Sequence, residues 1–450
     1  MPPRRLDRAA GVLLVAAYGD GYGPATQAAI RAARVLNSGM DPATVTAGPG
    51  LAWTGTLALA HLRDAREMAE SVRATVPESD DPLTADACVL WAAAIRAAVC
   101  DGSLDGPAAG LDLIPATRRT HWAWWIKQAE QQPPSSFTHN DAAVPHLQAS
   151  WSAIARTPAV EESPADAIFA CSQLVDAVNA AAEVGPGIAA TAGALLGARW
   201  GASAVPFDQL RTLAPLPDPE GTGVSPVPLD GPRCTTGALG DSGPRAAELV
   251  RLAALVAGGG RDDVRGWPSL ARRALYPHRV DPAVPHPADP GVMLGGLGAR
   301  DALSPRPTGP DRPPGPQAVV SLCQIGHADF EDIPSGDHLE FWLVDHPGDN
   351  NQPHFVIDQA ARAVAALRAE GKRVFLHCHA GLSRTPAVAA RYACLTAGTD
   401  PGTAFAQVAA ATGRPTDRVN PELRAAVYEL AGEVPPEPGD DPIAESRSRY

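Results

Sequence analysis

A change of texture near residue 280 divides this sequence into two parts with different periodicities. Before it, long segments rich in Ala and Leu repeat apolar positions at helical spacing, as in residues 83–100, and strand-like alternation is almost absent. Residues 244–260 continue the pattern and end in glycines, which is typical of a helix terminus. We therefore expect an all-helical domain over residues 9–275, interrupted by an irregular Pro- and Gly-rich loop at 216–243.

Beyond the boundary, short apolar runs bounded by Gly, Pro or Asp alternate with helical runs. The strand-like runs include "VMLGGLG", "AVVSLCQIG", "LEFWLVD" and "KRVFLHC", and the segment 353–371 between the last two has helical spacing. Strands that alternate with helices indicate an α/β layer with a mostly parallel sheet. The predicted fold is thus a two-domain chain, with an α/β domain at 280–432 and a polar, disordered tail at 433–450.

Composition excludes several classes of protein. The formal net charge of −13 argues against a nucleic-acid binder, which needs basic surfaces. Seven scattered cysteines without a CxxC pair favour a reducing compartment and argue against disulfides or structural zinc. No segment approaches the roughly 20 apolar residues of a membrane span, and the N-terminal apolar run is short for a signal peptide. We expect a cytoplasmic protein with no membrane partner and no cofactor.

The stretch "RVFLHCHAGLSRTPAVAARY" places a polar loop between a strand and a helix. Pro386 suits the first helical turn, so the loop amides meet at a helix N-terminus, where an oxyanion is held well. A thiol there ionises more readily, which makes Cys378 a candidate nucleophile. Arg384 can present a planar fork to two phosphate oxygens, and Gly381 allows the tight backbone curvature.

The order His377, Cys378, Gly381, Arg384, Thr385 resembles the signature of dual-specificity and tyrosine-type cysteine protein phosphatases. The resemblance implies a phosphocysteine intermediate on Cys378, phosphate binding by Arg384, and stabilisation of the thiolate by the Thr385 hydroxyl. The implied phosphate-binding loop also includes the following residues: His379, Ala380, Gly381, Leu382 and Ser383. A buried structural cysteine with an incidental arginine, and a rhodanese-like sulfur transferase, are the alternatives.

A general acid upstream distinguishes a phosphatase from a sulfur transferase. Asp345 ends the strand-like run "LEFWLVD" 33 residues before Cys378, about where the phosphatase family carries its acid, and Asp349 follows four residues later. General acid catalysis contributes about 10²–10⁴ in rate. Turn roles beside Pro347 and Gly348 are the competing interpretation. We expect Asp345 to be the acid, with Asp349 and His346 in reserve.

Other residues of this region have plainer roles. His377 is expected to support the loop by a ring hydrogen bond without taking part in chemistry. His379 and Ser383 are expected at the rim of the loop, and Cys394 within a buried helix.

The helical part resembles the ADP-ribosylglycohydrolase family. The resemblance rests on "AAYGDGYGPATQ", "GLAWTGTLALAHLRDA" and, above all, "IAATAGALLGARWG", and it covers roughly residues 9–275. It implies an all-helical fold in which two clusters of aspartates hold two magnesium ions. Magnesium demands oxygen ligands, and carboxylates supply them.

Both aspartate clusters are replaced in this sequence. The first motif reads Thr54, Gly55, Thr56, and the second reads Val184, Gly185, Pro186, Gly187. Asp20 matches the opening motif, although a turn or cap role is the simpler one, and Asp141 is expected in a loop. We expect a domain that keeps the helical fold without catalytic metals.

Three functions follow from these patterns. The first is a phosphatase joined to a pseudo-glycohydrolase, acting on a phosphorylated protein or small molecule. The second is ADP-ribosyl hydrolysis by a rearranged site, and the third is a non-catalytic module that binds ADP-ribose or an ADP-ribosylated partner. The pattern leaves open whether the substrate is phosphotyrosine, phosphoserine or phosphothreonine, a lipid or a nucleotide. The tryptophans of "THWAWWIKQAE" are a stacking platform or, as we expect, packed core.

Overall fold

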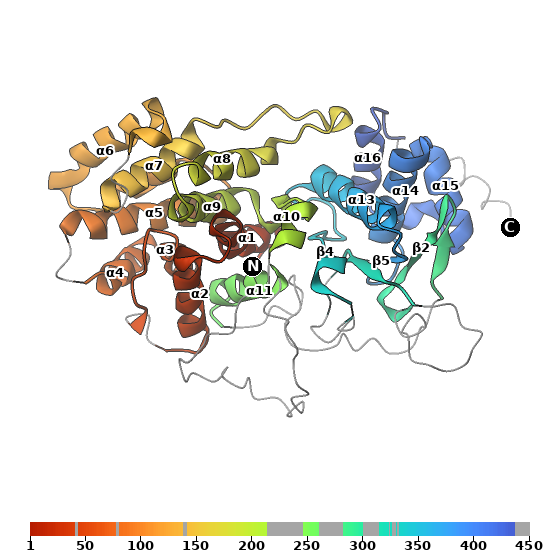
Figure 1. Cartoon of the computed structure of the whole chain (residues 1–450), viewed down its shortest axis with the longest axis horizontal. Coiled ribbons are helices and arrows are strands. Elements are labelled where there is room, and N and C mark those ends of the chain that lie inside the picture. Colours follow the sequence, from red (N-terminus) through yellow and green to blue (C-terminus); the bar gives the residue numbers. More distant parts are fainter. Residues whose placement is uncertain are drawn as a thin grey trace.

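Two lobes form the structure, a computed structural model (Figure 1). It describes residues 1–40, 44–77, 81–137, 142–213, 246–260, 282–299, 315–323, 325, 330 and 333–436. Among the sequence predictions, the loop at 216–243, Asp141 and nearly all of the tail at 433–450 lie outside these residues.

The first lobe is helical, as the sequence predicts. Its helices are α1 (Pro3–Asp20), α2 (Pro24–Asn37), α3 (Thr54–Ala60), α4 (Ala65–Thr75), α5 (Pro82–Asp101), α6 (Ala116–Gln131), α7 (Ala143–Ala155), α8 (Gln173–Ala182), α9 (Pro186–Trp200), α10 (Phe207–Thr212) and α11 (Ala246–Ala257). Helix α11 ends at the predicted glycine run and packs on α1 and α2, where Asn37 donates to the Leu252 carbonyl at 3.2 Å. Helix α11 thus packs with the helices of the first lobe.

Helices α1 and α9 lie in direct backbone contact at the centre of this lobe. A Cβ built on Gly197 would stand 2.1 Å from the carbonyl oxygen of Gly11, and one built on Gly193 would stand 2.4 Å from that of Val15. Any larger residue would hold the helices apart. The glycines of "IAATAGALLGARWG" thus allow the close packing of α1 and α9. Because larger residues do not fit there, this helix has a distinctive small-residue pattern.

Helix α5 is long and apolar. Among the described residues it alone has the length and composition of a membrane span, but 67% of its 18-residue window is buried within the structure. That burial is typical of a core helix. The tryptophans of α6 divide between core and surface, because Trp122 is fully buried and donates to Asp86 whereas Trp124 is 57% exposed. The prediction of a packed core is confirmed for Trp122 and is wrong for Trp124.

The second lobe is built on a five-stranded sheet of order β1-β2-β5-β3-β4. Its strands are β1 (Val284–His286), β2 (Asp289–Gly296), β3 (Ala318–Ser321), β4 (His338–Glu340) and β5 (Val374–Cys378). Strand β1 is antiparallel to β2, and the other pairs are parallel, which confirms the predicted mostly parallel sheet. The α-helices of this lobe are α13 (Pro353–Ala369), between β4 and β5, and then α14 (Arg384–Ala397), α15 (Pro401–Thr412) and α16 (Pro421–Leu430).

One predicted strand is shorter than its apolar run. β4 ends at Glu340, and the buried residues Phe341–Leu343 continue without strand pairing beyond one hydrogen bond from Phe341 N to the Ser321 carbonyl at 2.9 Å. An apolar run in the sequence indicates that its side chains are buried, and side chains on irregular backbone can be buried as well as those on a strand. Asp345 therefore lies in an irregular segment five residues after the strand, not at the strand end.

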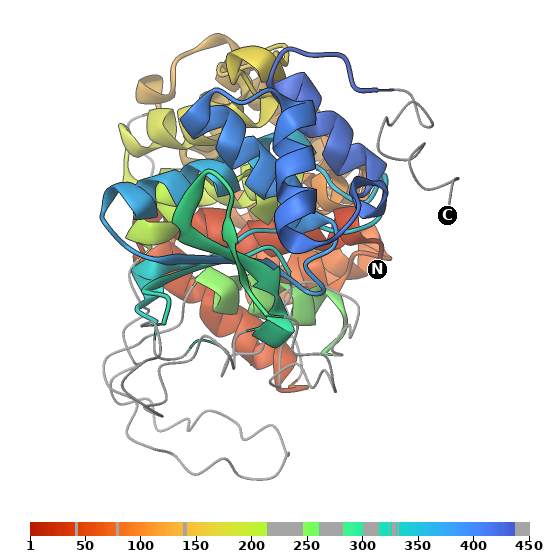
Figure 2. The ribbon, with the colours of Figure 1, turned by 90° about the vertical axis from the view of Figure 1, so that its right-hand side faces the viewer.

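Side chains of β5 alternate between the two faces of the sheet. Val374, Leu376 and Cys378 belong to the large core that α13 and α14 complete, whereas Phe375 lies in a small cluster with Val319 on the opposite face. Figure 2 turns this lobe toward the viewer, with the blue helices gathered above strands β1 and β2. The helices thus cover the face from which Cys378 projects.

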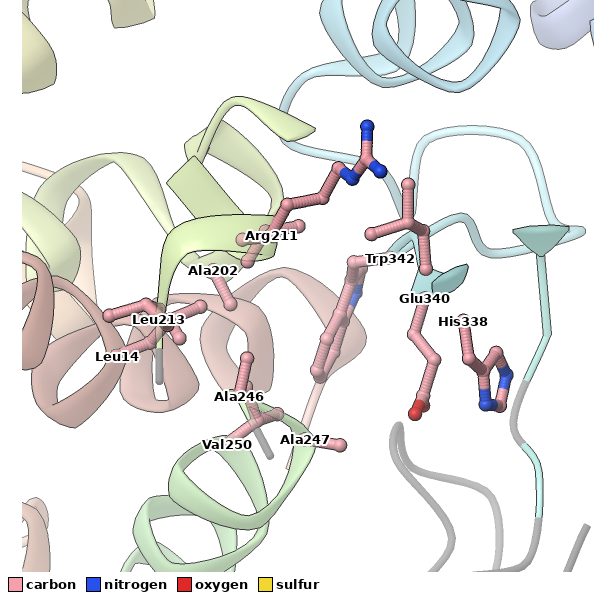
Figure 3. A pocket seen from close by; sticks show the side chains of 12 residues that line it. Leu14, Ala202, Arg211, Leu213, Ala246, Ala247, Val250, His338, Glu340 and Trp342 are labelled. Atoms are coloured by element: carbon pink, nitrogen blue, oxygen red, sulfur yellow. The ribbon is translucent and has the colours of Figure 1, made fainter. Parts of the chain in front are cut away.

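The two lobes contact each other through charged, polar and aromatic groups. Arg211 of α10 donates to Glu370 at 2.6 Å and to the Gly336 carbonyl at 2.9 Å. The segment between α7 and α8 crosses to the second lobe (Figure 1), where the ring of Phe169 meets that of Phe355 edge-on at 5.4 Å. A pocket of about 70 Å³ lies at the same boundary, lined by residues that include Arg211 and Trp342 (Figure 3).

Candidate active site

The loop after β5 places Cys378 at the carboxyl edge of the parallel strands. In the register of the sheet, Cys378 pairs with Gly296, the last residue of β2. The chain then turns through five residues and enters α14 at Arg384. This strand, loop and helix order is the one that the sequence predicts, and it puts the loop at the N-terminus of a 14-residue helix, where the helix dipole favours an anion.

The sulfur of Cys378 is buried, with 1% of the residue exposed, and it accepts the Gly381 N–H at 3.2 Å. Gly381 has φ of +67°, which other residues rarely adopt. A Cβ there would also stand 2.8 Å from the backbone of Gly295 and from a guanidinium nitrogen of Arg414. Both conformation and space therefore require glycine, and the resulting turn aims an amide at the sulfur.

Two carbonyl groups of the loop, and that of His377 near the end of β5, accept hydrogen bonds from neighbouring segments. Leu322 N donates to the His377 carbonyl at 2.8 Å, Leu297 N donates to the His379 carbonyl at 3.0 Å, and the Arg414 guanidinium donates to the Ala380 carbonyl. Neighbouring segments thus bind the acceptors of the loop backbone. Such a loop can offer its amide groups to an anion near the sulfur.

The Arg384 side chain is anchored where two other segments end. Its Nη1 donates to the Leu322 carbonyl at 3.0 Å and to the Leu343 carbonyl at 3.1 Å. Its Nε is buried, has no hydrogen-bond partner within the described residues, and lies 3.7 Å from Oδ2 of Asp345. A guanidinium N–H buried without a partner is unfavourable, and an anion bound beside it would remove the cost.

Asp345 lies against the loop, and Asp349 does not. Ser383 donates its hydroxyl to Oδ1 of Asp345 at 2.6 Å, and the same hydroxyl accepts the Asn420 N–H at 2.9 Å. Asp349 instead stands 3.2 Å from Nδ1 of the exposed His346. The structure therefore brings Asp345, Ser383 and Arg384 together and leaves the two reserve residues apart.

Several predicted details differ from the structure. Thr385 donates its hydroxyl to the Gly295 carbonyl at 3.2 Å rather than to the sulfur of Cys378. Ser383 is 3% exposed, so it is buried and not at the rim, because its hydroxyl joins two other segments. Ala380 and Leu382 are the exposed residues of the loop. Cys394 is only partly buried in α14.

The two histidines of the loop differ in setting. His377 is fully buried, its Nε2 lies 2.7 Å from the Ser321 hydroxyl, and its Nδ1 lies 3.3 Å from the Cys378 carbonyl. Its ring stacks on Phe375. These contacts fit the predicted supporting role. Burial, with the Arg384 charge as a smaller contribution, lowers the pKa of His379 from its ordinary value of 6.5, so this ring is neutral near pH 7.

Sequence reasoning missed the residues that brace the loop. The sequence pattern predicts Ser383 at the rim and gives no role to Asn420 or Arg414. Asn420 could have been found, because Asn before Pro at a helix start is an N-cap signal, and its side chain accepts the Glu422 N–H at 2.9 Å. Arg414 carried no such signal, since a partly exposed arginine in a loop contacts whatever the fold brings near it.

In the helical lobe, the threonines at the first magnesium motif donate their hydroxyl groups to backbone carbonyls. Thr54 donates to the Leu51 carbonyl at 2.7 Å, and Thr56 donates to the Ala29 carbonyl at 3.1 Å. Asp20 accepts the Thr26 N–H at 3.0 Å, which fits its predicted cap role at the start of α2, and burial raises its pKa. Within the described residues, no three His, Cys, Asp or Glu side chains gather as metal ligands would. These residues do not fit a pair of magnesium ions.

The comparison with protein families decides the identity of the helical lobe. Residues 21–224 match the family model described as ADP-ribosylglycohydrolase. The chain carries an ADP-ribosylglycohydrolase domain. Helix α1 precedes the matched residues, yet it packs on α9 of this domain through Gly11 and Gly197. The resemblance predicted from "IAATAGALLGARWG" is thereby confirmed. The magnesium ligands that the resemblance implies are not present at residues 54–56 and 184–187, where this domain has no aspartate.

Solved structures to which the chain is similar are phosphatases. Human DUSP28 aligns at 19% identity and a TM-score of 0.27, over 36% of this chain and 97% of that one. PTP-2 phosphatase of Cydia pomonella aligns at 23% identity and 0.26, over 34% and 89%. The Orf virus tyrosine phosphatase OH1 aligns at 18% identity and 0.25, over 36% and 90%. These likenesses are too weak to support a mechanism. No curated protein matches the chain.

Proposed function

We propose that the second lobe hydrolyses phosphomonoesters through a phosphocysteine intermediate, as a protein phosphatase of the dual-specificity or tyrosine type does. The observation that carries the proposal is the convergence at one loop of the Cys378 sulfur, an amide aimed at it, and the buried Nε of Arg384 beside Asp345. A nucleophile, an anion site and an acid are the three parts that this reaction requires.

In the first step, the Cys378 thiolate attacks the phosphorus of the substrate. A sulfur–phosphorus bond forms, the bond from phosphorus to the ester oxygen breaks, and the leaving oxygen takes its proton from the Asp345 carboxyl. Arg384 and the Gly381 amide would stabilise the charge on the phosphoryl oxygens. The chemistry asks Asp345 to be protonated at the start, within a site where Ser383 already fixes its position.

In the second step, water attacks the phosphocysteine. The Asp345 carboxylate accepts a proton from that water, the sulfur–phosphorus bond breaks, and inorganic phosphate and the Cys378 thiolate are released. A group that acts as acid and then as base is regenerated in its starting form after each turnover. No metal takes part in this scheme.

The placement of Asp345 favours this reaction over sulfur transfer. A sulfur transferase also uses a Cys-headed loop, but it has no leaving alcohol to protonate and therefore needs no carboxyl group above the sulfur. Asp345 lies within 3.7 Å of the Arg384 guanidinium and is bound by Ser383. The helical lobe then serves as a non-catalytic partner, for which ADP-ribose or an ADP-ribosylated molecule is the ligand class that its family implies.

Phosphate release from an aryl phosphate in the presence of a chelator tests the proposal. We expect release by the full chain, loss to background in Cys378→Ser, and little change in Cys394→Ser, a matched substitution of a half-buried cysteine in the same lobe. Release that survives Cys378→Ser, or that requires magnesium, would show that the nucleophile is elsewhere. Release of ADP-ribose with magnesium would instead support the helical lobe as the enzyme.

A further inference from the structure

The acid segment, residues 344–350, carries Asp345 and is held together by the side chain of Asn350. Asn350 accepts the Val344 N–H at 2.8 Å and donates to the Val344 carbonyl at 3.0 Å, so one side chain binds both backbone groups of the residue before Asp345. Asn350 is 2% exposed. A buried side-chain amide that makes two hydrogen bonds to one residue holds the backbone in one conformation, because breaking those hydrogen bonds leaves buried polar groups unpaired.

The same asparagine connects the acid segment to the start of α16. Its Nδ2 also lies 3.1 Å from Oε2 of Glu422, whose own N–H is bound by the Asn420 side chain. Asn420 N donates to Ser383, and Ser383 donates to Asp345. Starting from Asp345, the hydrogen bonds therefore run through the loop and α16 and return to the neighbouring residue. The carboxylate and its backbone are fixed from two sides.

The next residue reaches the helical lobe. Nδ2 of Asn351 donates to Oδ2 of Asp7 at 2.7 Å and to the Arg4 carbonyl at 2.9 Å, both in α1. Asp7 is fully buried and also accepts the N–H and the hydroxyl of Ser203, at 2.8 and 2.6 Å. A contact to a carboxylate held this firmly is a fixed anchor. The acid segment thus ends at a point determined by the other lobe.

We propose that Asn350 and Asn351 are positioning residues for the general acid: Asn350 sets the backbone from which Asp345 projects, and Asn351 anchors that segment to the helical lobe through Asp7. This inference rests on the proposed phosphatase function and deepens it. It gives the helical lobe an indirect part in the chemistry of the second lobe, since α1 supplies the anchor. Neither asparagine touches the phosphoryl group in this scheme.

Misplacing an acid has a signature that general damage lacks. A leaving group that is itself acidic departs without a proton, whereas a poor leaving group depends on the acid. Loss of positioning therefore slows phenyl or alkyl phosphates strongly and acidic aryl phosphates little. Loss of the loop or of the fold slows all of them equally. The dependence of kcat/KM on leaving-group pKa separates the two cases, because kcat/KM reports formation of the phosphocysteine and not its later hydrolysis.

The test measures kcat/KM for a series of aryl phosphates of rising leaving-group pKa, with the full chain and with Asn350→Ala, Asn351→Ala and Asp345→Asn. We expect wild type to be nearly independent of leaving group. Asn350→Ala should fall by about 10- to 100-fold on the poorest leaving group and by less than about 3-fold on the best, approaching Asp345→Asn. Asn351→Ala should lose about 3- to 10-fold on the poorest. Asn179→Ala, on the exposed side of α8, is the matched control and should behave as wild type.

Alkylation of Cys378 by iodoacetate, with and without phosphate, accompanies each variant and reports whether the loop remains folded. If Asn350→Ala keeps phosphate-protected alkylation and a wild-type leaving-group dependence, the positioning role of Asn350 is overturned. The same result for Asn351→Ala overturns the anchor to the helical lobe. If no variant, wild type included, releases phosphate through Cys378 even from the best leaving group, the proposed function itself fails.

Discussion

Replacing Gly197 by alanine tests the idea that backbone contact between α1 and α9 organises the helical lobe. The new Cβ would lie 2.1 Å from the Gly11 carbonyl oxygen, below the 3.0 Å that real Cβ contacts respect, so the helices must separate by about 1 Å. Overpacking of this kind typically costs about 1–3 kcal/mol. The obstacle is backbone, and Gly193 makes a second tight contact between the same helices, so we take the upper end, about 3 kcal/mol.

Alanine also favours a helix over glycine by about 1 kcal/mol, which leaves a net loss of about 2 kcal/mol for Gly197→Ala. For a lobe of this size the melting temperature should fall by about 4–8 °C, followed by circular dichroism at 222 nm, the usual helix signal. Gly185→Ala is the control, because no described atom lies within 4 Å of its Cβ and its φ of 166° suits any residue. If Gly197→Ala melts with Gly185→Ala or above wild type, the close-packing argument is wrong.

Two further changes test buried charges. Asp358→Ala should destabilise the second lobe by about 3–5 kcal/mol in urea unfolding, because Arg391, bonded to Asp358 at 2.6 Å and buried, would lose its charged partner; a change below about 1 kcal/mol would contradict this. Burial raises the pKa of Asp7 from 3.8 to about 6, so the folded protein binds this proton more tightly than the unfolded chain. The contribution of Asp7 to stability should therefore be full below pH 4 and decline by about 3 kcal/mol as pH rises past 6, and Asp7→Asn should abolish that decline in unfolding curves measured across this range.

The strands, helices and loop of the second lobe were predictable because each has a local cause. Glycines and prolines mark the ends of its elements, and the Cys378 loop has a fixed residue pattern between a strand and a helix. The end of β4 was not predictable from its apolar run, since Phe341–Leu343 are buried although they lie beyond the strand. Burial and pairing coincide in most strands, and the sequence shows only burial.

The chemistry-bearing residues were predictable by type, and their supports were not. Cys378, Arg384 and Asp345 were chosen because the reaction needs those groups, and the structure brings Arg384 and Asp345 together. The rim prediction for Ser383 is wrong because the buried position of Ser383 depends on a contact with Asn420. Asn420 lies 37 residues away along the chain, so the local sequence does not show this contact. Long-range hydrogen bonds leave no local pattern, so the links from Asn350 and Asn351 could come only from the fold.

The most direct test of the central claim is to trap the intermediate. An activated aryl phosphate is mixed with Asp345→Asn, which should still form the phosphocysteine with so good a leaving group but hydrolyse it slowly. After acid quenching and digestion, mass spectrometry should find one phosphoryl group on the peptide that contains Cys378. It should find none on the matching peptide of the double variant that carries both Asp345→Asn and Cys378→Ser. A phosphoryl group on any other residue, or phosphate release without a phosphorylated Cys378, would contradict the account.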